Sequence, residues 1–354
     1  MSRFLAHKLS VLKPYVPGEQ PQDMKYVKLN TNESPYSPAP ALLDALGNEE
    51  VRNLRLYSDP ELKELISAIS DFHGIDKKKI FCSNGSDEVL SFAFLAWGDK
   101  GVAYADITYG FYPVFTQLYG LDEKVIPLKE DFSIDTTEYE GLNRMCVIAN
   151  PNAPTGKVVS VESIRNIAKT NPDNVVIVDE AYVDFGGQSA LSLIDECENV
   201  LVVRTFSKSR QLAGARLGYA MGSEELIGDL NRVKFSFNPY NVNRLTSLLG
   251  ALSMNDKDWF DTCRNKIINT RKYTTEQLRA RGFEVLDSLA NFIFAKPCGI
   301  SGEDYYLKLK ENGVLVRYFN KDRIRDYVRI TIGTDEEMQT LIEKTDMILK
   351  ECKK

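Results

Sequence analysis

The sequence predicts an α/β fold in which a large domain with a mostly parallel sheet precedes a smaller C-terminal α+β domain. Between residues 79 and 222, short apolar runs alternate with helical patterns, as in a parallel sheet whose strands are joined by helices. Beyond residue 223, helical patterns dominate and only a few strand-like runs follow. A length of 354 residues also suits a large domain plus a smaller one.

The chain is expected to begin with an irregular arm over residues 1–30, because three prolines between positions 14 and 21 discourage regular structure. Residues 31–250 are assigned to the large domain and residues 251–354 to the small one. No flexible linker marks this boundary. It rests on the change of pattern alone.

The expected strands of the large domain are apolar runs with little polar alternation, which suits a seven-stranded type of sheet covered on both faces. These runs lie at 80–82, 102–104, 125–126, 146–149, 175–178 and 201–203. Strand-like runs of the small domain lie at 283–286, 291–295, 314–317 and 328–332. Capping-box patterns at 58–61 and 334–337 predict the starts of two helices.

Composition excludes several function classes. The net charge of 44 − 50 = −6 gives no support for nucleic-acid binding. No signal peptide and no apolar segment long enough for a membrane helix are expected. The six cysteines form no C-x-x-C pair and there are only two histidines, so no metal site is predicted. Cysteines inside apolar runs favour buried thiols and a cytoplasmic location.

Polar residues follow several of the predicted strands. Ser86 opens a helix after the run at 80–82, and Asn152 lies in a proline-rich turn after 146–149. Asp179 follows the run at 175–178, and Lys208 comes soon after 201–203. Alone, each is ordinary: a cap, a turn residue, a loop carboxylate and a solvated lysine. Because ligands bind beyond the carboxyl ends of such strands, we expect these residues to converge on one site.

Known nucleotide motifs are missing, but three other motifs are present. The chain contains neither G-x-G-x-x-G nor a P-loop, which disfavours a dinucleotide-binding or P-loop enzyme. Residues 152–156 read Asn-Ala-Pro-Thr-Gly, residues 179–182 read Asp-Glu-Ala-Tyr, and Arg216 follows Lys208 by eight positions. With these motifs the chain resembles the fold-type I pyridoxal-phosphate aminotransferases over nearly its whole length. Segments 12–15, 28–33, 56–57, 108–110 and 328–333 make it most similar to the histidinol-phosphate aminotransferases.

This resemblance implies that pyridoxal 5'-phosphate is the cofactor. Lys208 is then expected to bind the cofactor's aldehyde and to act as general acid and base. Asp179 is expected to stabilise the proton on the ring nitrogen, and Tyr182 to donate to the ring oxygen. The other cofactor contacts that the resemblance implies are the backbone N–H groups of Ser86 and Asp87, the side chains of Thr205, Ser207 and Arg216 around the phosphate, Tyr109 stacked on the ring, and Tyr57 from a partner subunit.

The turn before the Pro-Thr-Gly sequence departs from the family. The family usually has an asparagine where this chain has Ala153, and the nearest asparagine is Asn152. Either Asn152 reaches the ring oxygen through a shifted turn, or Tyr182 fills that role alone. The bond before Pro154 is expected to be cis by resemblance.

The resemblance also implies a substrate site. Arg329 matches an arginine that binds the anionic group of the substrate, and Arg317 matches a second arginine found in the histidinol-phosphate enzymes. Tyr15 and Asn32 match positions close to the substrate. Ordinary packing of Tyr57 and Tyr109, and simple exposure of Arg317, are the alternatives that the residues leave open.

The reaction implied is amino transfer between L-histidinol phosphate and 2-oxoglutarate in histidine biosynthesis, by ping-pong kinetics through pyridoxamine phosphate. An aromatic amino-acid aminotransferase and a threonine-phosphate decarboxylase are alternatives within the same fold. A regulatory protein without turnover is a third alternative. The partners expected are small-molecule substrates and a second copy of the chain in a homodimer with shared active sites.

Overall fold

The large domain is built around a seven-stranded sheet. Its strands are β2 (Ile80–Ser83), β3 (Val102–Ala105), β4 (Glu123–Ile126), β5 (Met145–Ala149), β6 (Val176–Asp179), β7 (Val200–Thr205) and β8 (Gly218–Met221). In this computed structural model, which describes residues 5, 9 and 11–352, the strand order is β2-β8-β7-β6-β5-β3-β4. Strand β8 runs antiparallel to both of its neighbours, and every other pairing is parallel. The predicted α/β class with a mostly parallel sheet is confirmed.

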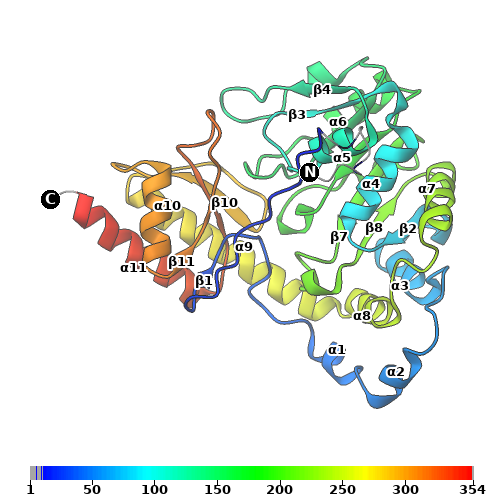
Figure 1. Cartoon of the computed structure of the whole chain (residues 1–354), viewed down its shortest axis with the longest axis horizontal. Helices are drawn as coiled ribbons and strands as arrows, with labels where there is room; N and C mark the ends of the chain where they lie inside the picture. The colour runs from blue at the N-terminus through cyan, green and yellow to red at the C-terminus, as the bar shows by residue number, and fades with distance from the viewer. Residues whose placement is uncertain (1–4, 6–8, 10, 353–354) are drawn as a thin grey trace.

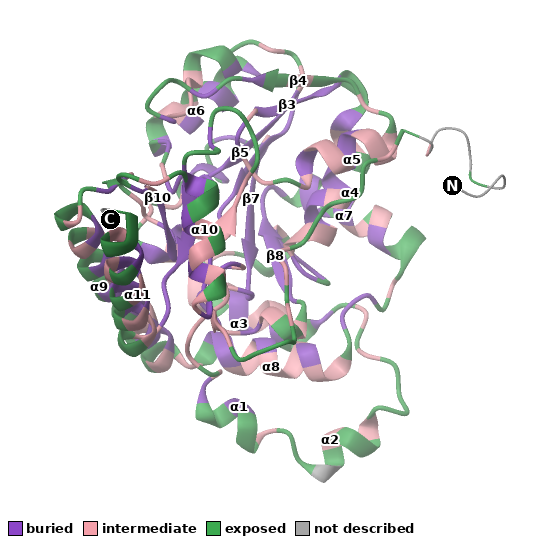
Figure 2. Ribbon diagram, turned by 60° about the vertical axis from the view of Figure 1, so that its left-hand side comes forward, coloured by how far each residue is buried: buried purple, intermediate pink, exposed green. Residues whose placement is uncertain are grey.

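Helices cover both faces of this sheet. The helices of this half are α1 (Pro40–Asp44), α2 (Asn48–Asn53), α3 (Lys63–His73), α4 (Ser86–Trp97), α5 (Tyr112–Tyr119), α6 (Val161–Thr170), α7 (Glu224–Phe237) and α8 (Arg244–Asn255). Because successive strand residues point to opposite faces, Val176 and Val178 of β6 join the core under α3 and α6, while Ile177 joins the core under α4, α5 and α7. The strands form the buried centre of the ribbon in Figure 2.

The small domain has its own sheet and core. Its elements are α9 (Lys257–Ala280), β9 (Glu284–Val285), β10 (Phe292–Lys296), α10 (Gly302–Glu311), β12 (Arg317–Tyr318), β13 (Val328–Thr331) and α11 (Asp335–Cys352). The four strands are antiparallel in the order β12-β13-β10-β9. Ile293, Ile330 and Leu341 belong to a core of their own. Helix α9 runs from beside α8 into this domain and links the two halves (Figure 1).

The N-terminal arm is attached to the small domain. Its strand β1 (Val27–Lys28) pairs in parallel with β11 (Val314–Leu315). The run at 314–317, predicted as one strand, therefore divides between two sheets, since Arg317 pairs with Arg329 instead. The predicted division between residues 250 and 251 falls inside α8 (Arg244–Asn255). Of the first ten residues of the predicted arm, all but 5 and 9 lie outside the described residues.

One of the two predicted capping boxes is confirmed. Thr334 N–H donates to the Glu337 carboxylate at 2.8 Å, and Glu337 N–H donates to Thr334 Oγ1 at 3.2 Å. The prediction for 58–61 is wrong, because α3 begins at Lys63 after Leu62 in a left-handed conformation (φ 51°). Ser58 Oγ instead donates to the carbonyl of Val242 at 2.7 Å.

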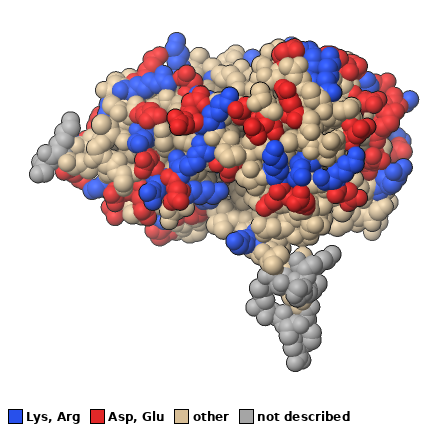
Figure 3. Space-filling view, turned by 90° about the horizontal axis from the view of Figure 1, so that it is seen from above, with Lys and Arg blue, Asp and Glu red and all other residues tan. Residues whose placement is uncertain are grey.

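The surface is charged and mixed. Acidic and basic side chains intermingle over the face seen in Figure 3. In the part of the chain that the structure describes, no helix combines the length and the apolar character needed to cross a membrane.

Strand β8 approaches the start of α4 at Gly218. A Cβ atom placed there would lie 2.3 Å from the backbone nitrogen of Ser86 and 2.5 Å from the carbonyl carbon of Gly85. Both neighbours are backbone atoms, so they cannot move aside as a flexible side chain could. Glycine at this position therefore lets the sheet and the N-terminus of α4 meet.

We expect Gly218→Ala to lower the free energy of unfolding by about 1–3 kcal/mol, because the added methyl group overpacks a backbone contact. Gly228→Ala is the matched control. Gly228 lies in α7, where an added Cβ atom would meet nothing within 4 Å, so alanine should raise the free energy of unfolding by about 1 kcal/mol. Urea denaturation of both variants measures the difference. Equal free energies of unfolding for the two variants would contradict a close approach of Gly218 to the start of α4.

Candidate functional site

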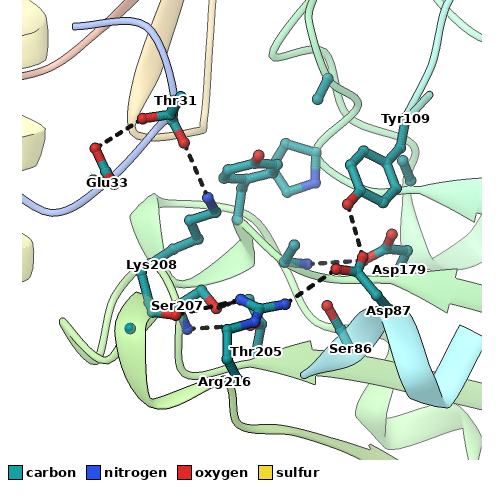
Figure 4. Close-up of a pocket in the computed structure, with 17 residues that line it drawn as sticks. Thr31, Glu33, Ser86, Asp87, Tyr109, Asp179, Thr205, Ser207, Lys208 and Arg216 are labelled. Atoms are coloured by element: carbon teal, nitrogen blue, oxygen red, sulfur yellow. Dashed lines mark hydrogen bonds and ion pairs between the residues drawn. The ribbon is translucent and has the colours of Figure 1, made fainter. Parts of the chain in front are cut away.

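A cavity of about 320 Å³ lies where β5, β6 and β7 end and α4 begins. Most of the predicted cofactor residues meet there, and Figure 4 shows those it labels gathered from a helix start, strand ends and loops. The predicted residues that line the cavity are Ser86, Asp87, Tyr109, Asp179, Tyr182, Thr205, Ser207, Lys208 and Arg216. The convergence expected from the strand ends is therefore found for Ser86, Asp179 and Lys208.

Asp179 ends β6 as a buried carboxylate, 5% exposed. Tyr112 Oη donates to its Oδ2 at 2.7 Å, and the N–H of Ala181 donates to its Oδ1 at 3.3 Å. Burial raises the pKa of Asp179 to about 6, although both hydrogen bonds act in the opposite direction. A buried carboxylate without a cationic partner suits a ligand that brings a positive charge, as a protonated ring nitrogen does.

Lys208 lies in the loop after β7, and its side chain reaches across the cavity. Its Nζ donates to the carbonyl of Thr31 at 3.3 Å and lies 5.9 Å from the ring centre of Tyr182. Burial, followed by the positive charge of Arg329, lowers the pKa of Lys208 to about 8. A substantial part of this amine is therefore neutral and nucleophilic slightly above neutral pH.

The N-terminus of α4 forms an anion site with the loop that carries Arg216. Helix α4 points its first N–H groups into the cavity from Ser86 onward. Arg216 donates to Ser207 Oγ at 3.5 Å and to the Asp87 carboxylate at 3.1 Å. Tyr109 Oη also donates to Asp87, at 2.7 Å. The Asp87 side chain thus orients Arg216 and Tyr109, which leaves its backbone N–H for an anion.

These groups fit the cofactor that the resemblance implies. Lys208 offers an amine for an aldehyde, and the unpaired buried carboxylate of Asp179 fits a ring nitrogen that carries a proton. The helix terminus at Ser86, with Ser207 and Arg216, fits a phosphate group. Amine, carboxylate and anion site all face the same cavity.

A second cavity, of about 280 Å³, adjoins the first, with which it shares Thr31, Tyr109, Ala153, Tyr182 and Lys208. All four predicted substrate residues line it: Tyr15, Asn32, Arg317 and Arg329. Lys208 therefore lines both cavities.

The two arginines of this second cavity differ in what they contact. Arg329 donates from Nη2 to the carbonyl of Asn30 at 2.9 Å, whereas its buried Nε has no hydrogen-bond partner among the described residues. Arg317 donates to the carbonyls of Val16 and Pro17, each at 3.2 Å. A buried N–H without a partner carries an energetic cost that an anionic ligand would remove.

The arm and the residues directly after it supply two further side chains to the second cavity. Tyr15 of the arm stacks on Phe111 with ring centres 4.4 Å apart, and burial raises the pKa of its hydroxyl. Asn32, just after the arm, is buried in a left-handed conformation (φ 55°) and donates from Nδ2 to Tyr182 Oη at 3.0 Å. Asn32 therefore orients a tyrosine of the first cavity, and Tyr15 forms part of the wall of the second.

Asn152 does not line either cavity, which corrects its prediction. Its Nδ2 donates to the carbonyl of Ile107 at 2.9 Å, and its Oδ1 accepts from Thr108 Oγ1 at 2.7 Å. The amide is thus used to brace the turn, and Ala153 takes the lining position. The Ala153–Pro154 bond is cis as predicted, and so is the bond between residues 150 and 151. Of the two residues predicted to contact the ring oxygen, only Tyr182 lines the first cavity.

Tyr57 also lies away from both cavities of its own chain. Its side chain is 78% exposed and stacks on Tyr240 with ring centres 4.5 Å apart. Arg244 donates to its backbone carbonyl at 3.3 Å.

Two groups of site residues were missed from the sequence. Thr31 and Glu33 line the first cavity beside Lys208. The second group is a buried ion network in which Arg204 contacts Glu180 at 2.9 Å and Asp184 at 2.8 Å. A glutamate directly after Asp179 and an arginine inside an apolar strand are the signals that could have revealed this network, because charged residues are seldom buried unless paired.

Arg210, which had no expected role, packs between aromatic rings. Its guanidinium lies 4.5 Å from the ring centre of Phe72 and 3.9 Å from that of Phe260. It also donates to the carbonyl of Ser253 at 2.6 Å. It thereby ties the loop of Lys208 to helices α3, α8 and α9.

Comparisons with known proteins agree with this geometry. A histidinol-phosphate aminotransferase of Brachyspira hyodysenteriae is 49% identical over 99% of this chain and 100% of its own length. One from Marinomonas sp. is 51% identical over 96% of this chain and 98% of its own. The solved histidinol-phosphate aminotransferase of Sinorhizobium meliloti, in complex with pyridoxal-5'-phosphate, has a TM-score of 0.85 at 22% identity, over 98% of this chain and 99% of its own, and shares the fold.

The family described as aminotransferase class I and II matches residues 24–344, which is most of the chain. The match spans both the cofactor residues and the substrate arginines. The chain therefore belongs to the class I and II aminotransferase family, which confirms the predicted fold class, enzyme class and pyridoxal-phosphate cofactor.

Proposed function

We propose that this chain transfers the amino group of L-histidinol phosphate to 2-oxoglutarate, with pyridoxal 5'-phosphate as cofactor. The observation that carries the proposal is the pair Arg317 and Arg329 in the cavity beside Lys208. Two guanidinium groups match a phosphate-bearing substrate, because each offers several donors in a planar array. Relatives 46–51% identical over nearly the full length bear the name of this activity, which supports the same substrate.

The residues of the first cavity divide the work of the reaction. When bound, the cofactor supplies an aldehyde for the amino group and a ring that withdraws electrons. Lys208 Nζ takes and returns the proton at the reacting carbon, for which a pKa of about 8 is well placed. The Asp179 carboxylate holds a proton on the ring nitrogen, and Tyr182 Oη donates to the ring oxygen. Arg216 and the start of α4 orient the phosphate.

The substrate phosphate is assigned to Arg329 and Arg317. The buried Nε of Arg329 gains a partner when an anion arrives. Arg317 uses Nη1 and Nη2 toward the arm, and a guanidinium has five N–H donors in total. Both arginines can therefore bind an anion while they keep their present partners.

We also propose a homodimer with shared active sites. Tyr57 is exposed in its own chain and lies in a region rich in exposed apolar side chains, which a second copy could cover. The exposed apolar residues of this region are Leu43, Leu46, Val51, Leu54, Leu56, Phe235, Phe237 and Tyr240. A tyrosine presented there could reach the phosphate site of the partner.

A cytoplasmic location belongs to the same proposal. Cys82, Cys146, Cys197 and Cys263 are buried free thiols. Burial raises the pKa of Cys82 and Cys146 to about 12, so these thiols stay protonated and inert. Buried free thiols of this kind are usual in reducing compartments.

We expect Asp179→Asn to lower kcat by about a hundredfold or more, because the neutral amide keeps the shape but loses the charge that stabilises a protonated ring nitrogen. The rate of the absorbance change of the bound cofactor on mixing with substrate measures the effect. Tyr112→Phe is the matched control, since it removes a donor to Asp179 and retains the carboxylate; its loss should be much smaller. Equal losses of kcat in the two variants would contradict the role proposed for the negative charge of Asp179.

We expect Arg317→Met to raise KM for histidinol phosphate by about tenfold to a hundredfold, because charged hydrogen bonds to the substrate phosphate are lost. KM for phenylalanine, which has no phosphate group, should stay the same. Arg325→Met is the control, because Arg325 is an exposed arginine paired with Asp322 at 3.7 Å, and it should change neither KM value. Stopped-flow mixing with histidinol phosphate, phenylalanine and threonine phosphate separately provides the readout. A response to phenylalanine alone would indicate an aromatic aminotransferase, and CO₂ release from threonine phosphate a decarboxylase.

We expect two inactive variants to complement each other if active sites are shared. Tyr57→Ala and Lys208→Ala subunits, unfolded, mixed and refolded together, should recover roughly a quarter of wild-type activity, since half of the dimers are mixed and each has one complete site. Each variant refolded alone is the control. Sedimentation equilibrium reports the oligomeric state. A dimer that shows no recovery would refute the sharing of Tyr57 while leaving the dimer itself in place.

A further inference from the structure

Glu33 lies at the edge of the first cavity, in the segment that leads from the arm into the large domain. It has no part in the roles assigned above. Figure 4 shows a path of hydrogen bonds from Glu33 through Thr31 to Lys208. We propose that Glu33 is a positioning residue that places the free amine of Lys208 and supplies its counter-charge.

The contacts along this path define the placement. Thr31 Oγ1 donates to Glu33 Oε2 at 2.8 Å, and the carbonyl of Thr31 accepts from Lys208 Nζ at 3.3 Å. Lys28 forms an ion pair with the same Oε2 at 2.6 Å. Glu33 therefore fixes the Thr31 residue whose backbone oxygen receives the amine, and Lys28 fixes Glu33 in turn.

The charges that face Lys208 come from four separate parts of the chain. Arg329 of β13 and Arg216 disfavour a protonated amine, whereas Glu33 and Asp87 of α4 favour it. Asp87 is already engaged with Arg216 at 3.1 Å and with Tyr109. Among the charged groups around Lys208, Glu33 raises the pKa of the amine the most, and Lys208 in turn lowers the pKa of Glu33.

This counter-charge acts when the amine is free. With the cofactor bound, Lys208 Nζ would be a free amine whenever a substrate amino group occupies the aldehyde carbon, and that amine would carry the proton of the reaction. A lysine facing two arginines would lose its proton too readily for that task. Glu33 offsets this repulsion, although its side chain and that of Lys28 are partly exposed (45% and 31%), so solvent weakens the effect.

The test measures cofactor uptake by the protein stripped of cofactor, in the absence of any substrate. In uptake, neutral Nζ attacks the aldehyde carbon, a carbon–nitrogen bond forms and one water molecule leaves. The rate at each pH follows the neutral fraction of Lys208. Glu33→Gln removes the counter-charge, lowers the pKa of Lys208 and should move the rise of the rate to lower pH. At pH 6.5 uptake should be roughly threefold faster or more, since one pKa unit corresponds to a tenfold change.

Three matched variants separate charge from structure. Glu33→Asp keeps the charge and should return the profile toward that of the wild type. Lys28→Gln removes the cation beside Glu33, so its profile should move to higher pH, opposite to Glu33→Gln. Glu19→Gln breaks a comparable ion pair, with Lys310, that lies away from the first cavity, and it should leave the profile in place.

Several outcomes would overturn the proposal. These are an unchanged profile in Glu33→Gln, an equal shift in Glu33→Asp and Glu33→Gln, or a shift of Lys28→Gln to lower pH. If Glu33→Gln fails to fold, the direction of the Lys28→Gln shift decides. The inference rests on the cofactor and not on the substrate. Failure of every variant and of the wild type to take up pyridoxal phosphate would instead refute the cofactor assignment.

Discussion

One buried guanidinium fixes the arrangement of the catalytic edge. Arg204 in β7 contacts Glu180 and Asp184, and Ser209 donates to Asp184 at 2.5 Å. These partners flank the aspartate and tyrosine that line the first cavity, and Ser209 directly follows the lysine proposed to bind the cofactor. Removing one member of such a buried network costs about 3–5 kcal/mol, because the remaining charge is left uncompensated. The network thereby holds the groups proposed for catalysis in place in the protein itself, which is the condition for electrostatic preorganisation.

The central part of the site could be predicted from the sequence because its geometry follows from local rules. Parallel strands end at the same edge of a sheet, so Asp179 after β6 and Lys208 after β7 had to lie near each other. Ser86 opens a helix at that edge for the same reason. Continuous apolar runs predicted strands buried on both faces, and the two cores confirm this for β2, β3, β5, β6 and β7. The prediction is wrong for the run at 125–126, because β4 lies at the edge of the sheet and Val125 is 46% exposed. Such inferences need only the order of the strands and the alternation of side chains between the two faces of a strand.

The remaining features depend on contacts between distant segments, which periodicity does not report. Asn152 was a candidate for the cofactor, yet its amide finds nearer partners in Ile107 and Thr108, and a buried amide must satisfy those bonds first. Thr31 reaches Lys208 across 177 positions of the chain. The first capping box failed because Ser58 bonds to Val242, 184 positions away. In each case a hydrogen bond to a residue distant in the sequence decides where the side chain or backbone group lies, and for Ser58 it replaces the local capping bond that the sequence pattern favours.

Arg317 contacts the arm and is also proposed to bind the substrate, so arm ordering and substrate binding are linked. Arg317 joins Val16 and Pro17 to the small domain through two of its N–H donors, and Tyr15 beside them packs on Phe111 of the large domain. An anion that binds the remaining N–H donors would restrict the motion of the Arg317 side chain. The contacts between Arg317 and the arm would then cost less conformational entropy than they do without substrate. The coupling is reciprocal by linkage, so an ordered arm raises the affinity for the anion by the same factor. A residue that belongs to neither the arm nor the large domain therefore holds one wall of the second cavity and, in the function proposed here, also contributes to its selectivity.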